Sequence, residues 1–269
     1  MDKGNRLDKF LSTIDFGGLD LKWGFDSNLY HYSPDVHLES MREDLSVINL
    51  AVYKNCGELD GGLEYLRKRD FPIDGEIWHA ALKEFADENF EEAASRYGIF
   101  SLCREGKSEY MWEKYSHNEG KGKPCIMTFD GKKIYDKVEK LIAKDLEQGY
   151  SPNGTLHFFL PCFYQPGDND KISRLAAFIT GNEYYGHLCR ESNWKDADKL
   201  TLAKDIIVMF ALMIKNGTQY QEEQETRLIV VGNQPTATLL RSVGLGFDPI
   251  VSVRYSLEDS GTPFEKVEV

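Results

Sequence analysis

The sequence lacks the features that would place it in an oxidising compartment or a membrane. Its five cysteines include no C-x-x-C pair, which favours reduced thiols over a disulfide framework or a zinc site. The longest fully apolar run, Ile206 to Ile214, is nine residues, about half of what a membrane span needs. The opening MDKGNRLDKF contains no apolar signal segment. We therefore expect a cytoplasmic protein with no membrane partner.

Basic residues are also in deficit, since 32 Lys and Arg stand against 44 Asp and Glu, a net charge of −12. A protein that coats nucleic acid through its phosphates needs a basic face, so that class is disfavoured, although one local basic patch stays compatible. The 269 residues are 41% hydrophobic and 28% charged, which is globular composition. We expect one domain over 1–269, with an N-terminal extension at 1–28 and a core at 29–256.

Short apolar segments alternate with helical patterns, which favours an α+β fold of antiparallel sheets with helical inserts. The expected strands are 29–33, 48–53, 98–103, 125–129, 155–163 (a strand pair or one bent strand), 227–231 and 250–256. The expected helices are 36–45, helical spacing within 63–97, a short helix at 111–115, 134–147 and a buried helix at 199–215. We expect the strands near 29–32, 99–103 and 225–231 to share one sheet system.

Two carboxylates and a guanidinium stand at the head of an apolar strand. Glu223, Glu225 and Arg227 are spaced by two residues, so a strand would direct all three to one face. Two carboxylates that close repel each other, which raises the pKa of one unless a cation or ligand intervenes. The alternative is an edge strand whose charges prevent aggregation. The E-x-E pair beside an Arg is nevertheless a better site candidate than most charge runs.

The other candidate residues can also be interpreted as packing or local hydrogen-bonding residues without a functional role. His31 and Tyr32 lie on the first expected strand, where a histidine flanked by aromatics is more often half-buried core than a ligand. Ser101, inside a buried strand, commonly bonds only to local groups. Trp112 and Tyr115 are spaced as packing residues of a short helix. The six histidines show no metal-ligand spacing, and Gly120-Lys121-Gly122-Lys123 lacks the spacer of a phosphate loop.

Three segments, taken together, resemble the bacterial family called domain of unknown function 2971, over roughly residues 29–231. They are Leu29-Tyr30-His31-Tyr32; the central Phe100-Ser101-Leu102, Met111-Trp112-x-x-Tyr115 and Cys125-Ile126-Met127-Thr128-Phe129; and the C-terminal Lys215…Tyr220-x-x-Glu223-x-Glu225-x-Arg227-Leu228. One departure is Asn55-Cys56-Gly57-Glu58, where that family commonly has Asn-Asp-Pro before a Glu.

The order of these motifs also resembles the ADP-ribosyltransferase superfamily, which has an Arg or His on a first strand, an aromatic-Ser motif on a second and a Glu, often as E-x-E, heading a later one. Cys103 departs from that pattern, since a Ser or Thr is expected there. The resemblance implies an ADP-ribosyltransferase-like fold with NAD as substrate and no metal. It implies Glu225 and Glu223 as catalytic residues, and contacts to NAD from His31, Tyr32, Ser101, Trp112, Tyr115 and Arg227.

The implied chemistry suits these residue types. Breaking the nicotinamide–ribose bond passes through an oxocarbenium-like centre, which a carboxylate stabilises. The second carboxylate would orient or deprotonate the acceptor, His31 would bond the adenosine ribose, and an aromatic ring would stack on nicotinamide. Such an enzyme would act as a bacterial toxin or phage-defence effector on a protein or nucleic-acid acceptor, with an antitoxin as a further partner.

Two alternatives belong to other functional classes. One is a metal-dependent nuclease that uses acidic residues. Against it, we find no Asp followed by a suitably placed Glu-x-Lys motif on an expected strand. The other is a non-catalytic regulatory or interaction module, in which Tyr32, Trp112, Tyr115 and Arg227 are core and interface residues. Nicotinamide release, metal-dependent cleavage of nucleic acid, or inertness towards both would separate the three.

Overall fold

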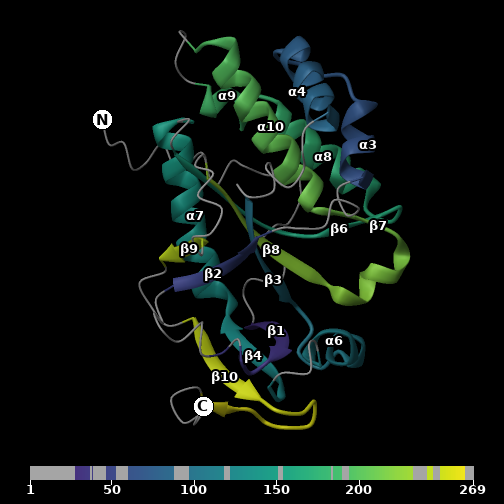
Figure 1. The fold of residues 1–269 in the computed structure, drawn as a ribbon, viewed down its shortest axis with the longest axis vertical. Coiled ribbons are helices and arrows are strands. Elements are labelled where there is room, and N and C mark those ends of the chain that lie inside the picture. Colours follow the sequence, from purple (N-terminus) through teal and green to yellow (C-terminus); the bar gives the residue numbers. More distant parts are fainter. Residues whose placement is uncertain are drawn as a thin grey trace.

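Antiparallel pairing organises the computed structural model, which describes residues 28–36, 38, 47–52, 60–87, 97–117, 122–150, 154–182, 184–189, 194–232, 241–244 and 249–263. Its strands are β1 (Asn28–Pro34), β2 (Val47–Val52), β3 (Tyr97–Cys103), β4 (Pro124–Asp130), β5 (Thr155–Pro161), β6 (Phe163–Gln165), β7 (Ile214–Asn216), β8 (Glu225–Gly232), β9 (Arg241–Gly244), β10 (Ile250–Arg254) and β11 (Thr262–Pro263). Its helical segments are α3 (Asp60–Arg67), α4 (Gly75–Asp87), α6 (Glu109–Met111), η2 (Trp112–Ser116), α7 (Gly131–Gln148), α8 (Asn169–Thr180), α9 (Tyr185–Leu188), α10 (Asp196–Leu212) and η4 (Thr218–Glu223). Figure 1 shows their arrangement.

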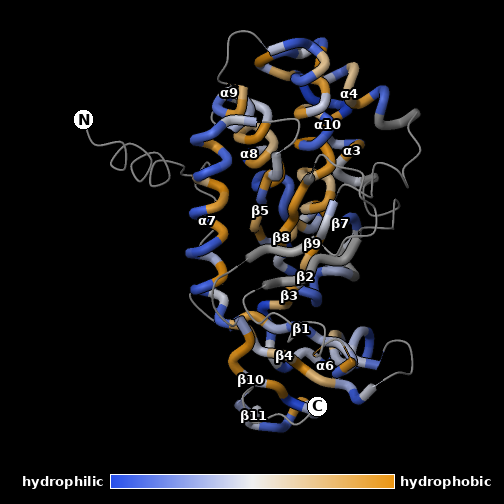
Figure 2. Tube along the Cα trace, turned by 60° about the vertical axis from the view of Figure 1, so that its left-hand side comes forward, coloured by the Kyte–Doolittle hydropathy of each residue, from blue (hydrophilic) through white to orange (hydrophobic). Residues whose placement is uncertain are grey.

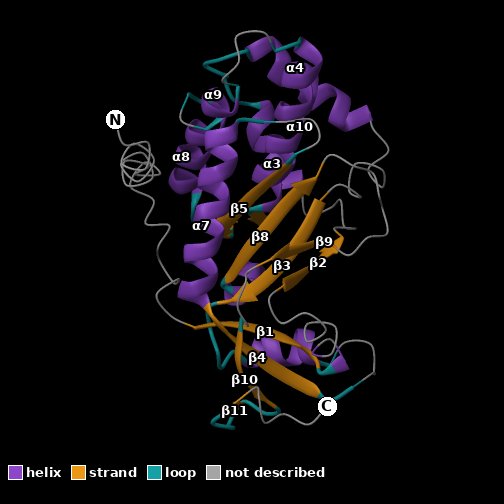
Figure 3. Cartoon of the chain, turned by 90° about the vertical axis from the view of Figure 1, so that its left-hand side faces the viewer, coloured by secondary structure: helices purple, strands orange, loops and turns teal. Residues whose placement is uncertain are grey.

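The large sheet branches at β3. One edge of β3 pairs with β8 over its whole length, and β5 continues the sheet beyond β8. The other edge is shared, because β2 pairs with Gly98 and Ile99 while β1 pairs with Cys103. From β1 the sheet runs on through β4, β10 and β11 (Figure 3). The mixed helix and strand composition, the antiparallel sheet and the common sheet system of the three motif-bearing strands are thus confirmed.

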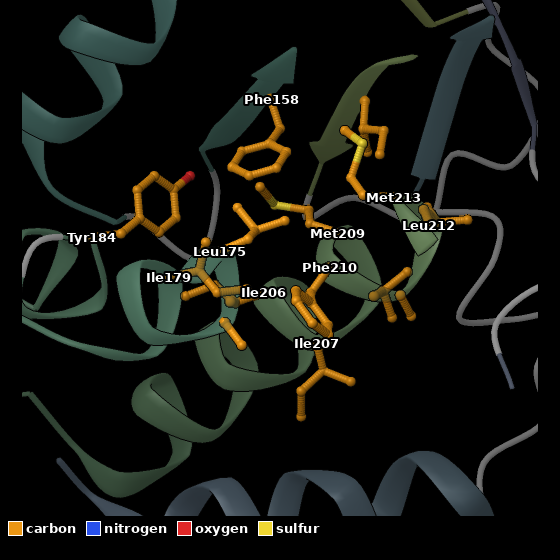
Figure 4. Packing of buried hydrophobic residues seen from close by; sticks show 14 of the residues in the cluster. Phe158, Leu175, Ile179, Tyr184, Ile206, Ile207, Met209, Phe210, Leu212 and Met213 are labelled. Atoms are coloured by element: carbon orange, nitrogen blue, oxygen red, sulfur yellow. The ribbon is translucent and has the colours of Figure 1, made fainter. Parts of the chain in front are cut away.

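Helix α10 forms the centre of the main hydrophobic core. Every residue from Ile206 to Leu212 is buried, because the helix packs against α3, α4 and α8 on its outer sides and approaches β8 (Figure 4). A fully buried aliphatic or aromatic side chain stabilises the fold by about 1.5–3 kcal/mol, so this helix is a large contributor. The expected buried helix is confirmed, but it runs from Asp196 to Leu212. The expected end at 215 is wrong, because Ile214–Asn216 form β7, which pairs with β6. Within the described residues, no helix combines the length and the hydropathy that a membrane crossing would require.

Helix α7 covers another part of the sheet with one apolar stripe. Ile134 and Val138 are fully buried, and the hydrophobic and hydrophilic residues alternate along the helix (Figure 2). The Asp130 side chain accepts a hydrogen bond from the backbone N–H of Lys133 at 3.0 Å, which satisfies one of the unpaired donors at the helix start. The amphipathic spacing of 134–147 therefore predicted this helix correctly.

Two segments differ from the expectation. The helical spacing within 63–97 is divided into α3 and α4, because Pro72 disfavours helix before it and Asp74 has a positive φ of 48°. The segment 155–163 is divided into β5 and β6, and β6 leaves the large sheet to pair with β7 in parallel. The expected helix at 36–45 and the end of the 63–97 spacing lie mostly outside the described residues.

Candidate functional site

The E-x-E motif heads an interior strand. Strand β8 pairs with β3 on one side and β5 on the other, with Glu225 opposite Cys103 and Arg227 opposite Ser101. The interpretation of these charges as protection for a sheet edge is therefore wrong, because β8 has no free edge over this stretch. Charged side chains in such a place need partners of opposite charge, since burial without them is costly.

Glu225 and Arg227 form a buried pair. The carboxylate of Glu225 accepts hydrogen bonds from Nε of Arg227 at 2.7 Å and from its Nη2 at 3.2 Å. Nζ of Lys215, on β7, lies 2.5 Å from the same carboxylate. Arg227 also donates from Nη1 to the carbonyl of Leu212, the last residue of α10, at 2.6 Å. The motif thereby joins the central helix to the sheet.

Glu223 reaches the same place by a route that the strand periodicity did not predict. It ends the 3₁₀-helix η4, and Gln224 adopts a left-handed conformation (φ 42°) before β8 begins. The expectation that Glu223 shares a strand face with Glu225 is therefore wrong. Its side chain, 1% exposed, nevertheless pairs with Lys215 and also contacts Nζ of Lys114 at 2.7 Å. The turn of η4 thus directs the Glu223 carboxylate to the Lys215 ammonium, which Glu225 also contacts.

The remaining partners come from the turn after β3. The π-helical segment η2 supplies Lys114 and Tyr115, and the Tyr115 hydroxyl donates to the Glu223 carboxylate at 2.7 Å. The side chain of Ser108 caps α6, which precedes η2 directly. We call Lys114, Lys215, Glu223, Glu225 and Arg227 the charge cluster. It contains three cations and two carboxylates, and so carries one net positive charge.

Electrostatics keep the charge cluster ionised. Burial raises the pKa of Glu225, but Arg227 and Lys215 outweigh burial and hold that pKa at about 2. Burial likewise opposes a lowering of the Glu223 pKa by Lys215 and Lys114, and the lowering prevails. For Lys114 and Lys215, burial lowers the pKa, yet the facing carboxylates raise it above its usual value. All of these groups are therefore charged at neutral pH.

Ser101 and His31 lie on opposite faces of the sheet. Ser101 is paired with Arg227 across the strands and shares its face, whereas the ring of His31 stacks on Phe100 with centroids 5.4 Å apart. Successive residues of a strand point to opposite faces, so Phe100 and His31 lie on the side away from Glu225. The Nδ1 atom of His31 also hydrogen-bonds the Ser101 carbonyl at 2.9 Å. Ser101 lies on β3 between the residues that pair with β2 and the residue that pairs with β1.

Tyr32 and Trp112 support the turn that carries Lys114. The Tyr32 hydroxyl donates to the carbonyl of Glu105 at 2.7 Å and accepts from the backbone N–H of Ser108 at 3.1 Å. Trp112 packs against a small apolar cluster that contains Tyr32 and meets the ring of His117 edge-on. Of the predicted residues, the structure thus brings Glu223, Glu225, Arg227 and Tyr115 into one network, in which Tyr115 contacts Glu223, Arg227 contacts Glu225, and Lys215 links the two carboxylates.

Sequence reasoning missed several residues that complete the cluster. Lys215 bridges both carboxylates, and the Tyr164 hydroxyl, on β6, accepts a hydrogen bond from the backbone N–H of Glu225 at 2.9 Å. Lys215 and Tyr220 belong to the C-terminal motif of the family resemblance, and that motif was the available signal for them. Nothing in the sequence indicates Tyr164, because β6 approaches β8 only through the tertiary fold.

A hollow of about 400 Å³ lies beside α3 and β6. It is lined by Gly61, Glu64, Tyr65, Lys68, Arg69 and Gln165. Gln165 is the strand neighbour of Tyr164, and such neighbours point to opposite faces, so the small β6–β7 ribbon separates this hollow from the charge cluster. Within the described part of the chain, no group of three or more His, Cys, Asp or Glu side chains is arranged to hold a metal ion.

Comparison with protein-family models, with curated proteins and with solved structures found no match to this chain. The site is therefore interpreted from its own geometry. That geometry places two ionised carboxylates beside two buried cations, with one ammonium and a tyrosine hydroxyl nearer to solvent.

Proposed function

We propose that the protein is an ADP-ribosyltransferase-like enzyme that cleaves NAD, with an ADP-ribosyltransferase-like fold and Glu225 and Glu223 as its catalytic carboxylates. The observation that carries the proposal is their convergence on one ammonium group, Lys215, at the head of an interior strand. Ser101, paired with Arg227 on the neighbouring strand, also agrees with the motif order of that superfamily.

In this reaction the bond between nicotinamide and C1′ of its ribose breaks, and the electron pair leaves with nicotinamide. The nucleophile of the acceptor then bonds to C1′ and releases its proton to solvent. Positive charge develops on the ribose in the transition state, where nearby carboxylates stabilise it. Because the pKa of Glu225 is held at about 2, this carboxylate is a weak base at neutral pH. We therefore assign it electrostatic stabilisation.

Substrate entry requires a rearrangement of the ion pairs. The carboxylate of Glu225 is buried and occupied by Arg227 and Lys215, so a ribose hydroxyl reaches it only when the Lys215 ammonium moves aside. The diphosphate of NAD provides the displaced ammonium with a new anionic partner. His31 has no role at Glu225 in the proposal, because its ring lies on the other face of the sheet.

The test is nicotinamide release from NAD by the wild type and by Glu223→Gln. Glu222→Gln is the matched control, because Glu222 is the adjacent residue on η4 but is exposed. We expect wild-type and Glu222→Gln rates that agree within about twofold, and a loss of at least about tenfold in Glu223→Gln, as for removal of one charge-stabilising group. Incubation with protein or nucleic acid, followed by mass measurement, identifies the acceptor. Wild-type protein that leaves NAD intact under every such condition would contradict the proposal.

The regulatory or interaction module remains the second candidate, and one observation favours it. Both carboxylates of the charge cluster already have complete sets of partners, as expected for a buried network that specifies the fold. In that case Glu223→Gln alters thermal stability and leaves no NAD-dependent reaction to lose.

A further inference from the structure

The hollow beside α3 and β6 brings two cations together in a chain of acidic composition. Among its lining residues, Lys68 and Arg69 are positive and Glu64 is negative, so the lining carries one net positive charge, whereas the whole chain carries −12. Tyr65 and Gln165 add a phenol ring and a side-chain amide. We call this cavity the basic hollow.

The basic hollow lies where α3 approaches the β6–β7 ribbon. A Cβ atom at Gly61 would lie 3.1 Å from Cβ of Asn216 on β7 and 3.5 Å from Oε1 of Gln165 on β6, so the glycine allows the close approach of the helix. The volume of about 400 Å³ falls within the range of about 300–1,000 Å³ that small-molecule sites occupy. A single inorganic ion would fill only part of this volume, so the hollow suits a molecule with an organic body.

Arg69 carries a hydrogen-bond donor that lacks an acceptor. Its Nε atom is buried and has no hydrogen-bond partner within the part of the chain that the structure describes. Buried donors are nearly always satisfied, so this one suggests an acceptor from outside the chain. The guanidinium is a planar fork of donors that matches the oxygens of a phosphate or carboxylate. Because the Arg69 side chain is only half-buried, a turn towards the hollow would bring the fork to such a group.

Lys68 provides a second positive charge at the rim. Its Nζ atom pairs with Glu64 at 2.6 Å, and the two side chains are 72% and 62% exposed. Such an exposed pair contributes little to stability, so the ammonium can leave Glu64 for a stronger anion. A phosphate monoester carries about 1.5 to 2 negative charges at pH 7 and therefore matches both cations better than a carboxylate does.

We propose that the basic hollow is a binding site for a small organic phosphate monoester. Arg69 and Lys68 bind the phosphate group, and the body of the ligand lies against Tyr65, with the Gln165 amide as a partner for a polar substituent. A body that contains a flat ring suits Tyr65, because aromatic rings attract one another in offset and edge-to-face arrangements. The basic hollow shares no residue with the charge cluster, so this proposal is independent of NAD cleavage.

The test measures binding of phenyl phosphate to the full chain by calorimetry at constant ionic strength, beside inorganic phosphate and phenol. The wild type is expected to bind phenyl phosphate at least about tenfold more tightly than either of the other probes, because only the ester contacts both the cations and the ring. Equal affinity for inorganic phosphate would indicate an adventitious ion only, and it would overturn the proposal. Absence of phenyl phosphate binding at millimolar concentration would overturn it too.

A matched pair of variants tests the role of Arg69. Arg69→Gln should weaken phenyl phosphate binding by about tenfold or more, since it removes a charge-assisted fork. Arg67→Gln makes the same change of charge at an exposed residue outside the lining, and it should bind within about twofold of the wild type. Should Arg69→Gln fail to fold, Arg69→Lys keeps the charge without the fork and should weaken binding by about threefold or more. Equal losses in the Arg67 and Arg69 variants would refute the assignment.

A variant without any change of charge locates the ligand. Gln165→Phe places a bulkier side chain in the lining, so it should compete with the body of phenyl phosphate and weaken its binding by about tenfold. Binding of inorganic phosphate should change much less, because the phosphate group lies at the cations. A folded Gln165→Phe protein that binds phenyl phosphate as the wild type does would contradict the proposed location. None of these measurements uses NAD, so their outcome is separate from that of the proposed activity.

Discussion

Arg227 holds both carboxylate oxygens of Glu225, its neighbour two residues earlier on the same strand. Such a pair is possible because alternate residues of β8 share a face and the guanidinium is a planar fork that fits a carboxylate. The pair lies between β8 and the end of α10, where Arg227 also binds the Leu212 carbonyl. A local ion pair therefore fixes the position of a central helix.

Loss of this guanidinium should destabilise the protein strongly. In Arg227→Met the Glu225 carboxylate loses its bidentate partner while it stays buried, and removal of one partner from a buried pair costs about 3–5 kcal/mol. Lys132→Met is the control, because it removes the exposed pair with Asp136, which contributes at most about 1 kcal/mol. Urea unfolding measures both changes, and equal losses in the two variants would contradict the buried role of Arg227.

Acid should weaken the fold through Glu225. Its pKa is lowered from an unfolded value of about 4.3 to about 2, so the folded state favours the ionised form. That stabilisation is complete above the unfolded pKa and is lost as the pH falls towards about 2, a change on the order of 3 kcal/mol. The free energy of unfolding, measured between pH 6 and pH 3, should fall less steeply in Glu225→Gln. Parallel pH profiles for wild type and variant would disprove the pKa assignment.

The sequence predicted much of this arrangement, but it did not predict the contacts that Glu223 and Tyr164 make in the site. The apolar run at 206–214 predicted the buried helix, and β-branched residues predicted β8. The two-residue spacing correctly placed Glu225 and Arg227 on one face. The same spacing gave a wrong position for Glu223, because Gln224 adopts a left-handed conformation and the strand begins only after it, at Glu225. Periodicity also carries no information on Tyr164, whose contact with Glu225 joins two strands that belong to different sheets.

Three thiols should resist alkylation in the native protein. Burial raises the pKa of Cys103, Cys125 and Cys162 to about 12, so little reactive thiolate forms at pH 8. Burial raises the pKa of Cys189 less, to about 11, and this thiol is only half-buried, so it serves as the internal comparison. Mass spectrometry after iodoacetamide treatment should find Cys189 labelled before the three buried thiols, which should be labelled after unfolding in urea. Native labelling of those three at the unfolded rate would contradict their burial.

The contact between α3 and α10 should tolerate no side chain at Gly62. A Cβ atom there would lie 2.6 Å from Cα of Ala211, which is backbone and cannot turn away. Gly62→Ala is therefore expected to cost about 1–3 kcal/mol through overpacking. Gly75→Ala is the matched control, since its Cβ would meet nothing closer than 3.9 Å, and it should be neutral or stabilising by up to about 1 kcal/mol. Equal thermal melting of the two variants would refute the close helix approach.

The most direct test of the proposed activity is nicotinamide release by Glu225→Gln, measured beside the wild type and Glu222→Gln. Because Glu225 also holds Arg227, we expect Glu225→Gln to lose about 1–3 kcal/mol of stability, so rates are taken well below its melting temperature and per folded molecule. The account predicts that Glu225→Gln turns over NAD at least about a hundredfold more slowly, roughly 3 kcal/mol of barrier, while Glu222→Gln matches the wild type. A folded Glu225→Gln protein that releases nicotinamide at the wild-type rate would contradict the assignment of Glu225 as a catalytic residue.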